Sequence, residues 1–269
     1  MNLQQKTRTN QYMVDQETGR ISFLDTRFYF HEPTGDYFPS VTTILGMAYP
    51  KDAMFFEWLK QNGEDADRIR DEAGEFGSVV HGMTEDYDKG LPVTILDEFG
   101  RPKYKAREWK FFEKYVDFTD RFKPVIENIE VNMTSGNLRT AGTLDRKIEL
   151  EHLIGKAMAK RKYILDIKTS NLLHDSYWLQ LATYKRMWNE ANPGDQIDGV
   201  CILWLNAKTR TEGKGDAIQG VGWQLVFPPK ELDHYDRLWD ATRLLYDEQF
   251  GDMKPKNLSY QLSYQKTNE

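Results

Sequence analysis

The chain has 269 residues, of which 39% are hydrophobic, 29% charged and 13% aromatic, and this composition excludes a largely disordered protein. The formal net charge of −6 excludes nucleic-acid binding by bulk charge, so any contact with DNA needs a local basic groove or metal ions that offset carboxylates. The single cysteine, Cys201, excludes an intrachain disulfide framework and a cysteine-ligated zinc or iron–sulfur site built from this chain alone.

The cellular location is predicted from features that the sequence lacks. No apolar run is long enough to span a bilayer, and residues 1–6 lack the apolar core of a signal peptide. Together with the lone cysteine, these features indicate a reducing, cytoplasmic environment and no membrane association.

The N-terminal part is predicted to hold a tail, a hairpin and several helices. Residues 1–20 are polar and without period, so we expect a flexible tail. Pro33-Thr34-Gly35-Asp36 supplies the turn of a β-hairpin, and Ser40 or Thr42 is placed to cap a short helix after it. Further helices are expected over residues 53–61, 64–89 and 103–122, with a loop over 90–102.

Three glycines stand inside the helix expected over residues 64–89. Gly74, Gly77 and Gly82 each cost about 1 kcal/mol relative to alanine in a helix interior. Two explanations fit them: close approach of another backbone or a ligand, or a break in the helix near Gly74 to Gly77.

The C-terminal part alternates strands and helices. Strands are expected over residues 125–133, 138–150, 162–168, 199–205 and 221–227, and helices over 176–191 and from 228 to about 249. Residues 151–161 are expected to connect two of these strands, and residues 251–269 to form a second flexible tail. This order predicts one domain over residues 21–250, an α/β fold in which helices flank a mixed central β-sheet.

The strand expected over residues 162–168 carries opposite charges in an apolar run. Because side chains alternate along a strand, Leu165 and Ile167 share one face, while Asp166 and Lys168 share the other. Metal-dependent phosphodiester chemistry uses such a pair, with Asp166 holding a divalent cation and Lys168 stabilising or orienting the attacking water.

A second carboxylate, Asp145, stands 21 positions earlier, on the preceding strand. If the two strands are antiparallel neighbours, Asp145 and Asp166 converge as oxygen ligands for one or two Mg²⁺ or Mn²⁺ ions. Two alternatives remain open. Asp145 pairs only with a neighbouring basic residue, or the site shifts register to Glu130, Asp145 and Lys147, since Asp145-Arg146-Lys147 repeats the spacing.

Two helices add candidate side chains at four-residue spacing, which places each pair on one helix face. His81 and Glu85 form the first pair, and the His81 imidazole is a competent Mn²⁺ ligand beside two carboxylates. Gln180 and Tyr184 form the second, just after the Asp166 strand. Gln180 is placed to bond a phosphate or Lys168, whereas core packing is the default role of Tyr184.

Basic residues are the candidates for contact with DNA. We expect contributions from Arg68, Arg139, Lys160, Arg161 and Lys185, with a solvated protein surface as the alternative for each.

Five motifs in order resemble the PD-(D/E)xK nuclease superfamily, and most closely its RecB-like exonuclease branch. They are Pro39 to Leu45, His81, Gly142-Thr143-Leu144-Asp145, Asp166-Ile167-Lys168-Thr169-Ser170 and Gln180-Leu181-Ala182-Thr183-Tyr184. The resemblance covers roughly residues 21–205. It implies a restriction-endonuclease-like core and a metal-dependent DNA exonuclease of phage or bacterial replication, recombination or repair, acting on DNA with a possible protein partner.

The resemblance also implies roles for individual residues. His81, Asp145, Asp166 and the Ile167 carbonyl would bind metal, and Lys168 would be the catalytic lysine. Gln180 and Tyr184 would be the motif after it, and Glu85 a supporting residue. The chain departs from the family in having Leu144-Asp145 in place of Pro-Asp, no four-cysteine cluster and no helicase motifs. A DNA- or partner-binding module without activity, and a structure-selective endonuclease, are the competing interpretations.

Overall fold

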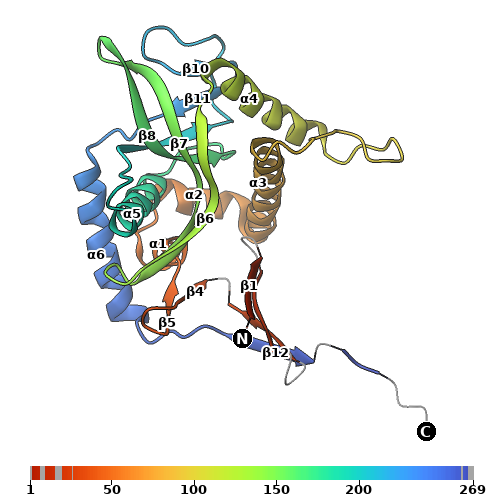
Figure 1. Ribbon diagram of the computed structural model, residues 1–269, viewed down its shortest axis with the longest axis vertical. Coiled ribbons are helices and arrows are strands. Elements are labelled where there is room, and N and C mark those ends of the chain that lie inside the picture. Colours follow the sequence, from red (N-terminus) through yellow and green to blue (C-terminus); the bar gives the residue numbers. More distant parts are fainter. Residues whose placement is uncertain (1, 7–9, 16–19, 26, 262, 266–269) are drawn as a thin grey trace.

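The computed structural model describes residues 2–6, 10–15, 20–25, 27–261 and 263–265. Within these residues a six-stranded sheet lies at the centre, in the order β10-β11-β9-β8-β7-β6 (Figure 1). Its strands are β6 (Val125–Ser135), β7 (Thr140–Ile154), β8 (Ala157–Lys168), β9 (Gly199–Trp204), β10 (Gln219–Gly220) and β11 (Trp223–Val226). β8 and β9 pair in parallel and the other neighbours antiparallel, which confirms the predicted mixed central sheet.

Helices cover both faces of this sheet. One face packs against α1 (Val41–Ala48), α5 (Asp175–Ala191) and α6 (Leu232–Phe250), and the other against α3 (Ala66–Asp88) and α4 (Ala106–Phe122). Along β8 and β9, Ile164 and Ile202 belong to the first core, whereas Leu165 and Leu203 belong to the second. Because side chains alternate between two buried cores, both strands have a continuously apolar sequence.

The N-terminal hairpin and helices match their predicted positions. β4 (Phe28–His31) and β5 (Asp36–Pro39) form the hairpin, and Ser40 caps α1 by accepting a bond from the Thr43 amide at 3.0 Å. After α2 (Ala53–Asn62) and the 3-10 turn η1 (Gly63–Asp65), α3 continues for 23 residues. The proposed break near Gly74 to Gly77 is therefore wrong. A Cβ at Gly77 would lie 3.4 Å from Thr169 Oγ1, so α3 does pass close to the end of β8 there.

The prediction that residues 151–161 only connect two strands is also wrong. β7 and β8 pair as far as Ile154 with Ala157, and the turn is reduced to Gly155-Lys156, where Gly155 has φ +62°. The hairpin projects from the body of the molecule (Figure 1). Its alternation of polar and apolar residues is hard to recognise because much of the hairpin end is exposed to solvent.

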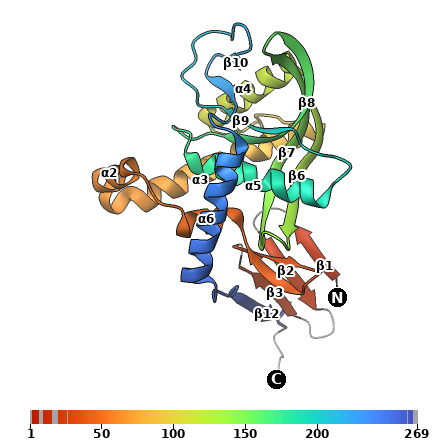
Figure 2. The ribbon, with the colours of Figure 1, turned by 90° about the vertical axis from the view of Figure 1, so that its left-hand side faces the viewer.

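The predicted terminal tails contain strands. β1 (Asn2–Lys6), β2 (Asn10–Asp15), β3 (Arg20–Leu24) and β12 (Asn257–Gln261) form a separate sheet in the order β1-β2-β3-β12 (Figure 2). Residues 1–20 and 251–269 are thus corrected from tails to segments that include strands. No local period reveals them, because β12 pairs with β3 across almost the whole chain. Among the described helices, none combines the length and apolar character needed to cross a membrane.

Candidate metal-binding and catalytic site

The site forms where two neighbouring strands separate. The pairing of β7 with β8 runs from the hairpin turn to Arg146 and Leu165 and stops there. The next opposed residues are Asp145 and Asp166, both almost fully buried. In place of a ladder bond, the Ile167 amide donates to Asp145 Oδ2 at 3.2 Å. The divergence of the strands therefore opens the sheet where the two predicted carboxylates stand.

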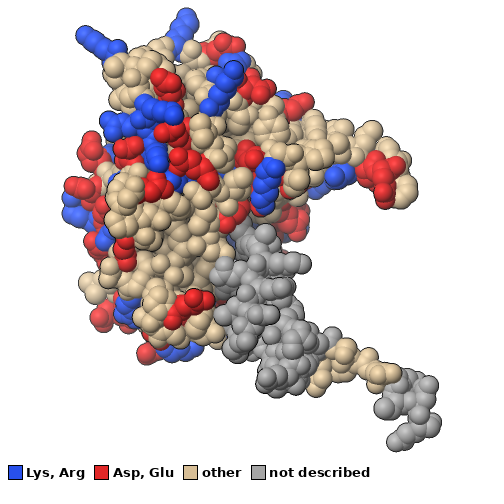
Figure 3. Space-filling model, in the orientation of Figure 1, with Lys and Arg blue, Asp and Glu red and all other residues tan. Residues whose placement is uncertain are grey.

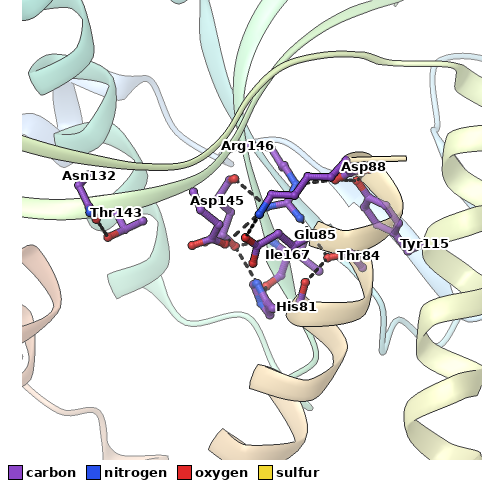
Figure 4. Close-up of polar contacts among 12 residues, drawn as sticks. His81, Thr84, Glu85, Asp88, Tyr115, Asn132, Thr143, Asp145, Arg146 and Ile167 are labelled. Carbon is purple, nitrogen blue, oxygen red and sulfur yellow. Dashed lines mark hydrogen bonds and ion pairs between the residues drawn. The ribbon is translucent and has the colours of Figure 1, made fainter. Parts of the chain in front are cut away.

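His81 reaches this point from α3. Its Nε2 lies 2.8 Å from the Ile167 carbonyl oxygen, and its Nδ1 lies 3.3 Å from Asp145 Oδ2 (Figure 4). A carbonyl can only accept, so Nε2 carries a proton. Nδ1 and the Asp145 carboxylate then face each other as two acceptors, unless a second proton or a cation lies between them. The structure thus brings together three of the four predicted metal ligands.

Glu130 of β6 adds a further carboxylate. Ligand atoms of His81, Glu130 and Asp145 all lie within 4.8 Å of one another. Glu130 stands opposite Asp145, between the pairs Ile129–Arg146 and Val131–Leu144, which share one register. Its φ of +51° is left-handed, a conformation that costs a non-glycine residue about 1–2 kcal/mol.

These donors suit a hard divalent cation. Two carboxylates, one imidazole nitrogen and one backbone carbonyl oxygen form a set that Mn²⁺ or Mg²⁺ accepts. The set contains no sulfur, because the only cysteine is buried in the second core. The residues present therefore fit the metal that the sequence motifs imply.

Asp166 and Lys168 form a close ion pair on the α5 side of β8. Lys168 Nζ lies 2.7 Å from Asp166 Oδ2 and 4.7 Å from the centre of the Tyr177 ring. Burial lowers the pKa of Lys168, but the charges of Asp166 and Asp145 outweigh burial and raise that pKa above its ordinary value. Lys168 is therefore an ammonium at neutral pH, suited to stabilising negative charge and not to accepting a proton.

Gln180 and Tyr184 of α5 line the same site. Gln180 Nε2 donates to the Tyr184 hydroxyl at 3.3 Å, and burial raises the pKa of Tyr184, so its hydroxyl stays protonated. A Cβ at Gly142 would lie 2.5 Å from the Tyr184 ring, so only glycine fits at that position of β7. The glycine of the Gly142-to-Asp145 motif thus makes room for the tyrosine of the next motif.

Two cavities meet at the site. The first has a volume of about 450 Å³ and is lined by Asp166, Gln180, Tyr184 and, from the β4–β5 hairpin, Tyr29. The second has a volume of about 460 Å³ and lies against α3 and the residues that follow β8. His81, Lys168 and Tyr177 line both cavities. A ligand in either cavity therefore has access to the Lys168 ammonium.

Tyr29 and Tyr177 were missed as site residues. Tyr177 lies three residues before Gln180, and this spacing places it on the same helix face. Tyr29, whose hydroxyl lies 3.2 Å from Thr143 Oγ1, comes from a hairpin distant in sequence and carries no local signal.

Glu85 and Lys147 have other partners. Glu85, one turn after His81, pairs with Lys89. The buried Lys147 ammonium pairs with Glu127 and Asp195 and lies 4.9 Å from the Trp188 ring. The alternative site of Glu130, Asp145 and Lys147 is therefore not assembled, even though its two carboxylates are neighbours.

Four of the five predicted DNA-binding residues lie near acidic residues, and their contact with DNA stays a prediction. Each of four is near an acidic partner: Arg68 with Asp65 and Glu72, Arg139 with Asp247, Lys160 with Glu149, and Arg161 with Asp198. Lys185 lies on α5. Figure 3 shows basic and acidic side chains interspersed over one face of the molecule. The partners of Arg68 stand at helical spacing in the sequence, whereas those of Arg139, Lys160 and Arg161 are distant in the chain and carry no local signal.

Comparisons with known proteins do not name a family for this site. No protein-family model matches the chain, and no curated protein shows detectable similarity to it.

Proposed function

We propose that the protein is a divalent-metal-dependent deoxyribonuclease, and that it acts as an exonuclease. The observation that supports this most is the position of the Asp166–Lys168 ion pair, beside the cluster of His81, Asp145 and the Ile167 carbonyl and open to a cavity. A buried carboxylate–ammonium pair next to a set of oxygen and imidazole donors is suited to phosphodiester hydrolysis.

The metal and the protein residues have separate tasks in this proposal. Mg²⁺ or Mn²⁺, when bound, supplies Lewis acidity and lowers the pKa of a coordinated water. Lys168 offsets the negative charge that builds on the scissile phosphate, and Asp166 holds its ammonium in position at 2.7 Å. The Gln180 amide and Tyr184 hydroxyl line the cavity as donors to phosphate oxygens.

The negative net charge does not contradict this proposal. Three acidic residues, Glu130, Asp145 and Asp166, lie at or beside the site, and a bound cation would offset part of their charge. We infer a reducing, cytoplasmic setting from the single buried cysteine. The family resemblance is the sole basis for a bacterial or phage-infected cell and for a replication or recombination protein as partner.

Cleavage of end-labelled linear single- and double-stranded DNA tests the proposal. Wild type and Lys168→Ala are compared in Mn²⁺, Mg²⁺ or EDTA. We expect metal-dependent loss of label by the wild type and none by the variant. Cleavage in EDTA, or full activity of Lys168→Ala in a folded protein, would contradict the proposed chemistry.

Circular DNA separates the two modes of cleavage. A strict exonuclease leaves circular single-stranded and duplex DNA intact, whereas a structure-selective endonuclease opens at least one of them. If no DNA is cleaved and no Mn²⁺ is bound, a binding module without activity replaces the proposal.

A further inference from the structure

The acidic groups of the site divide into two sets on the two sides of β8. Asp166 lies on the side of α5, where Lys168 Nζ is 2.7 Å away. Asp145 lies with His81 of α3, and the third ligand-type side chain within 4.8 Å of both is Glu130. The three-side-chain cluster thus contains Glu130 where the motif pattern alone implies Asp166.

Glu130 lies opposite Asp145 and has an unusual backbone conformation. In a regular ladder Glu130 would pair with Asp145, because its neighbours Ile129 and Val131 pair with Arg146 and Leu144. Glu130 itself has a left-handed φ of +51°, while the pairs on both sides of it share one register. Its position opposite Asp145 places its carboxylate beside Asp145 and His81, close to the point where β7 leaves β8.

A purely structural role as counter-charge to Arg146 explains this geometry poorly. The fully buried Arg146 guanidinium already binds Asp88 through Nε at 2.5 Å, and it also donates to Thr84 Oγ1 and to the Asp145 carbonyl (Figure 4). Its contact with Glu130 is the longest of these, at 3.5 Å. Asp88 therefore balances most of the charge of Arg146, while the Glu130 carboxylate also lies within 4.8 Å of the ligand atoms of His81 and Asp145.

We propose that Glu130 is a ligand of the divalent ion, which it holds together with His81 and Asp145. This inference rests on the proposed nuclease function and extends it. Asp166 then serves mainly to hold Lys168, so that the metal ligands approach from α3, β6 and β7 while the ammonium lies on the α5 side.

Glu127 offers a matched control on the same strand. It carries the same carboxylate as Glu130, but it binds Lys147 and Lys162 and does not belong to the His81 cluster. Replacing either glutamate by glutamine removes one negative charge and keeps the side-chain shape. A difference between the two variants therefore reports position and not total charge.

The test is calorimetric titration of Mn²⁺ into the metal-free full chain, for wild type, Glu130→Gln and Glu127→Gln. We expect Glu130→Gln to weaken Mn²⁺ binding by at least about 10-fold, and Glu127→Gln to change it by less than about 2-fold. Equal binding by wild type and Glu130→Gln would overturn the inference. So would equal weakening by both variants.

Two controls keep the test decisive. If Glu130→Gln does not fold, as judged by circular dichroism, the titration is made with Glu130→Asp, whose shorter carboxylate is also expected to weaken binding; unchanged affinity overturns the inference. If the wild type binds no Mn²⁺ and cleaves no DNA, the proposed function fails together with the inference. If the wild type binds and cleaves while Glu130→Gln binds equally well, only the role of Glu130 fails.

Discussion

Two triplets of the same pattern lie on neighbouring strands of this protein and have different environments. In Asp166-Ile167-Lys168, the carboxylate and the ammonium lie 2.7 Å apart and line a cavity. In Asp145-Arg146-Lys147, the carboxylate turns to His81, while the buried ammonium binds Glu127 and Asp195. Identical spacing therefore does not make the same site.

The course of the strands explains the difference. Lys147 is paired on both sides, with Asn128 of β6 beside a register shift and with Ile164 of β8, so its side chain is enclosed by neighbouring elements. Lys168 is the last residue of β8, beyond the point where β7 has separated from it. A charged pair becomes available to a ligand where the sheet opens, and serves packing where the sheet is closed.

The largest expected effect is on cleavage by variants of the two lysines. Lys168→Met should lower the cleavage rate by at least about 100-fold, because in the proposed mechanism it removes a charge that stabilises the transition state. Lys147→Met should keep the rate of the folded protein within a few-fold. The rates are measured on linear DNA and corrected for the folded fraction, and a greater loss in Lys147→Met would reverse our assignment of the two triplets.

The free energy of unfolding should fall when Lys147 loses its ammonium. Removing the ammonium by Lys147→Met leaves Glu127 and Asp195 with Lys162 as their remaining shared partner, and these carboxylates are 27% and 37% exposed. Their partial exposure reduces the penalty below that of a fully buried pair, so we expect a loss of about 2 kcal/mol in the free energy of unfolding. Urea denaturation measures this loss, and an unchanged midpoint would show that the pair contributes little.

Two glycines sharpen the comparison between the site and the rest of the sheet. A Cβ would lie 2.5 Å from the Tyr184 ring at Gly142 and 2.8 Å from the Tyr163 ring at Gly199. Each alanine substitution should therefore destabilise the fold by about 1–2 kcal/mol through overpacking. Only Gly142→Ala should also lower the cleavage rate of the folded protein. Equal activity of the two variants would show that the position of Tyr184 is not important for cleavage.

The smallest expected effect is on the pH dependence of stability and depends on His152, near the turn of the β7–β8 hairpin. Its ring stacks on Phe227 and bonds the Tyr163 hydroxyl, and burial lowers the pKa of His152 below its ordinary value of 6.5. As the pH falls, the unfolded chain therefore protonates His152 before the folded protein does. The contribution of neutral His152 to the free energy of unfolding is lost as the pH falls below 6.5. The free energy of unfolding, measured by urea denaturation on both sides of this pH, should change less in His152→Phe than in the wild type. The two slopes against pH should differ by under about 1.4 kcal/mol per pH unit.

The sequence predicts the site well where local alternation decides the structure. The apolar run around Asp166 and Lys168 indicates a buried strand and assigns both charges to one face. Ser40 is recognised as a helix cap because its side chain can reach the first turn of α1. These features depend only on residues close together in the chain.

Long-range geometry is what the sequence does not reveal. Glutamate at position 130 carries no signal for a left-handed backbone, which is usually marked by glycine or asparagine. Tyr29 reaches the site only because the β4–β5 hairpin packs against β7. The terminal sheet depends in the same way on the pairing of β3 with β12.

That terminal sheet has a consequence for how the protein is made. During synthesis β3 leaves the ribosome early, and β12 follows only after the whole central domain has been translated. Until then the edge of β3 that will receive β12 is open to pairing with other chains. A nascent or truncated chain without residues 257–261 keeps this exposed edge, so self-association of such a product, visible by light scattering, distinguishes an incomplete chain from a finished one.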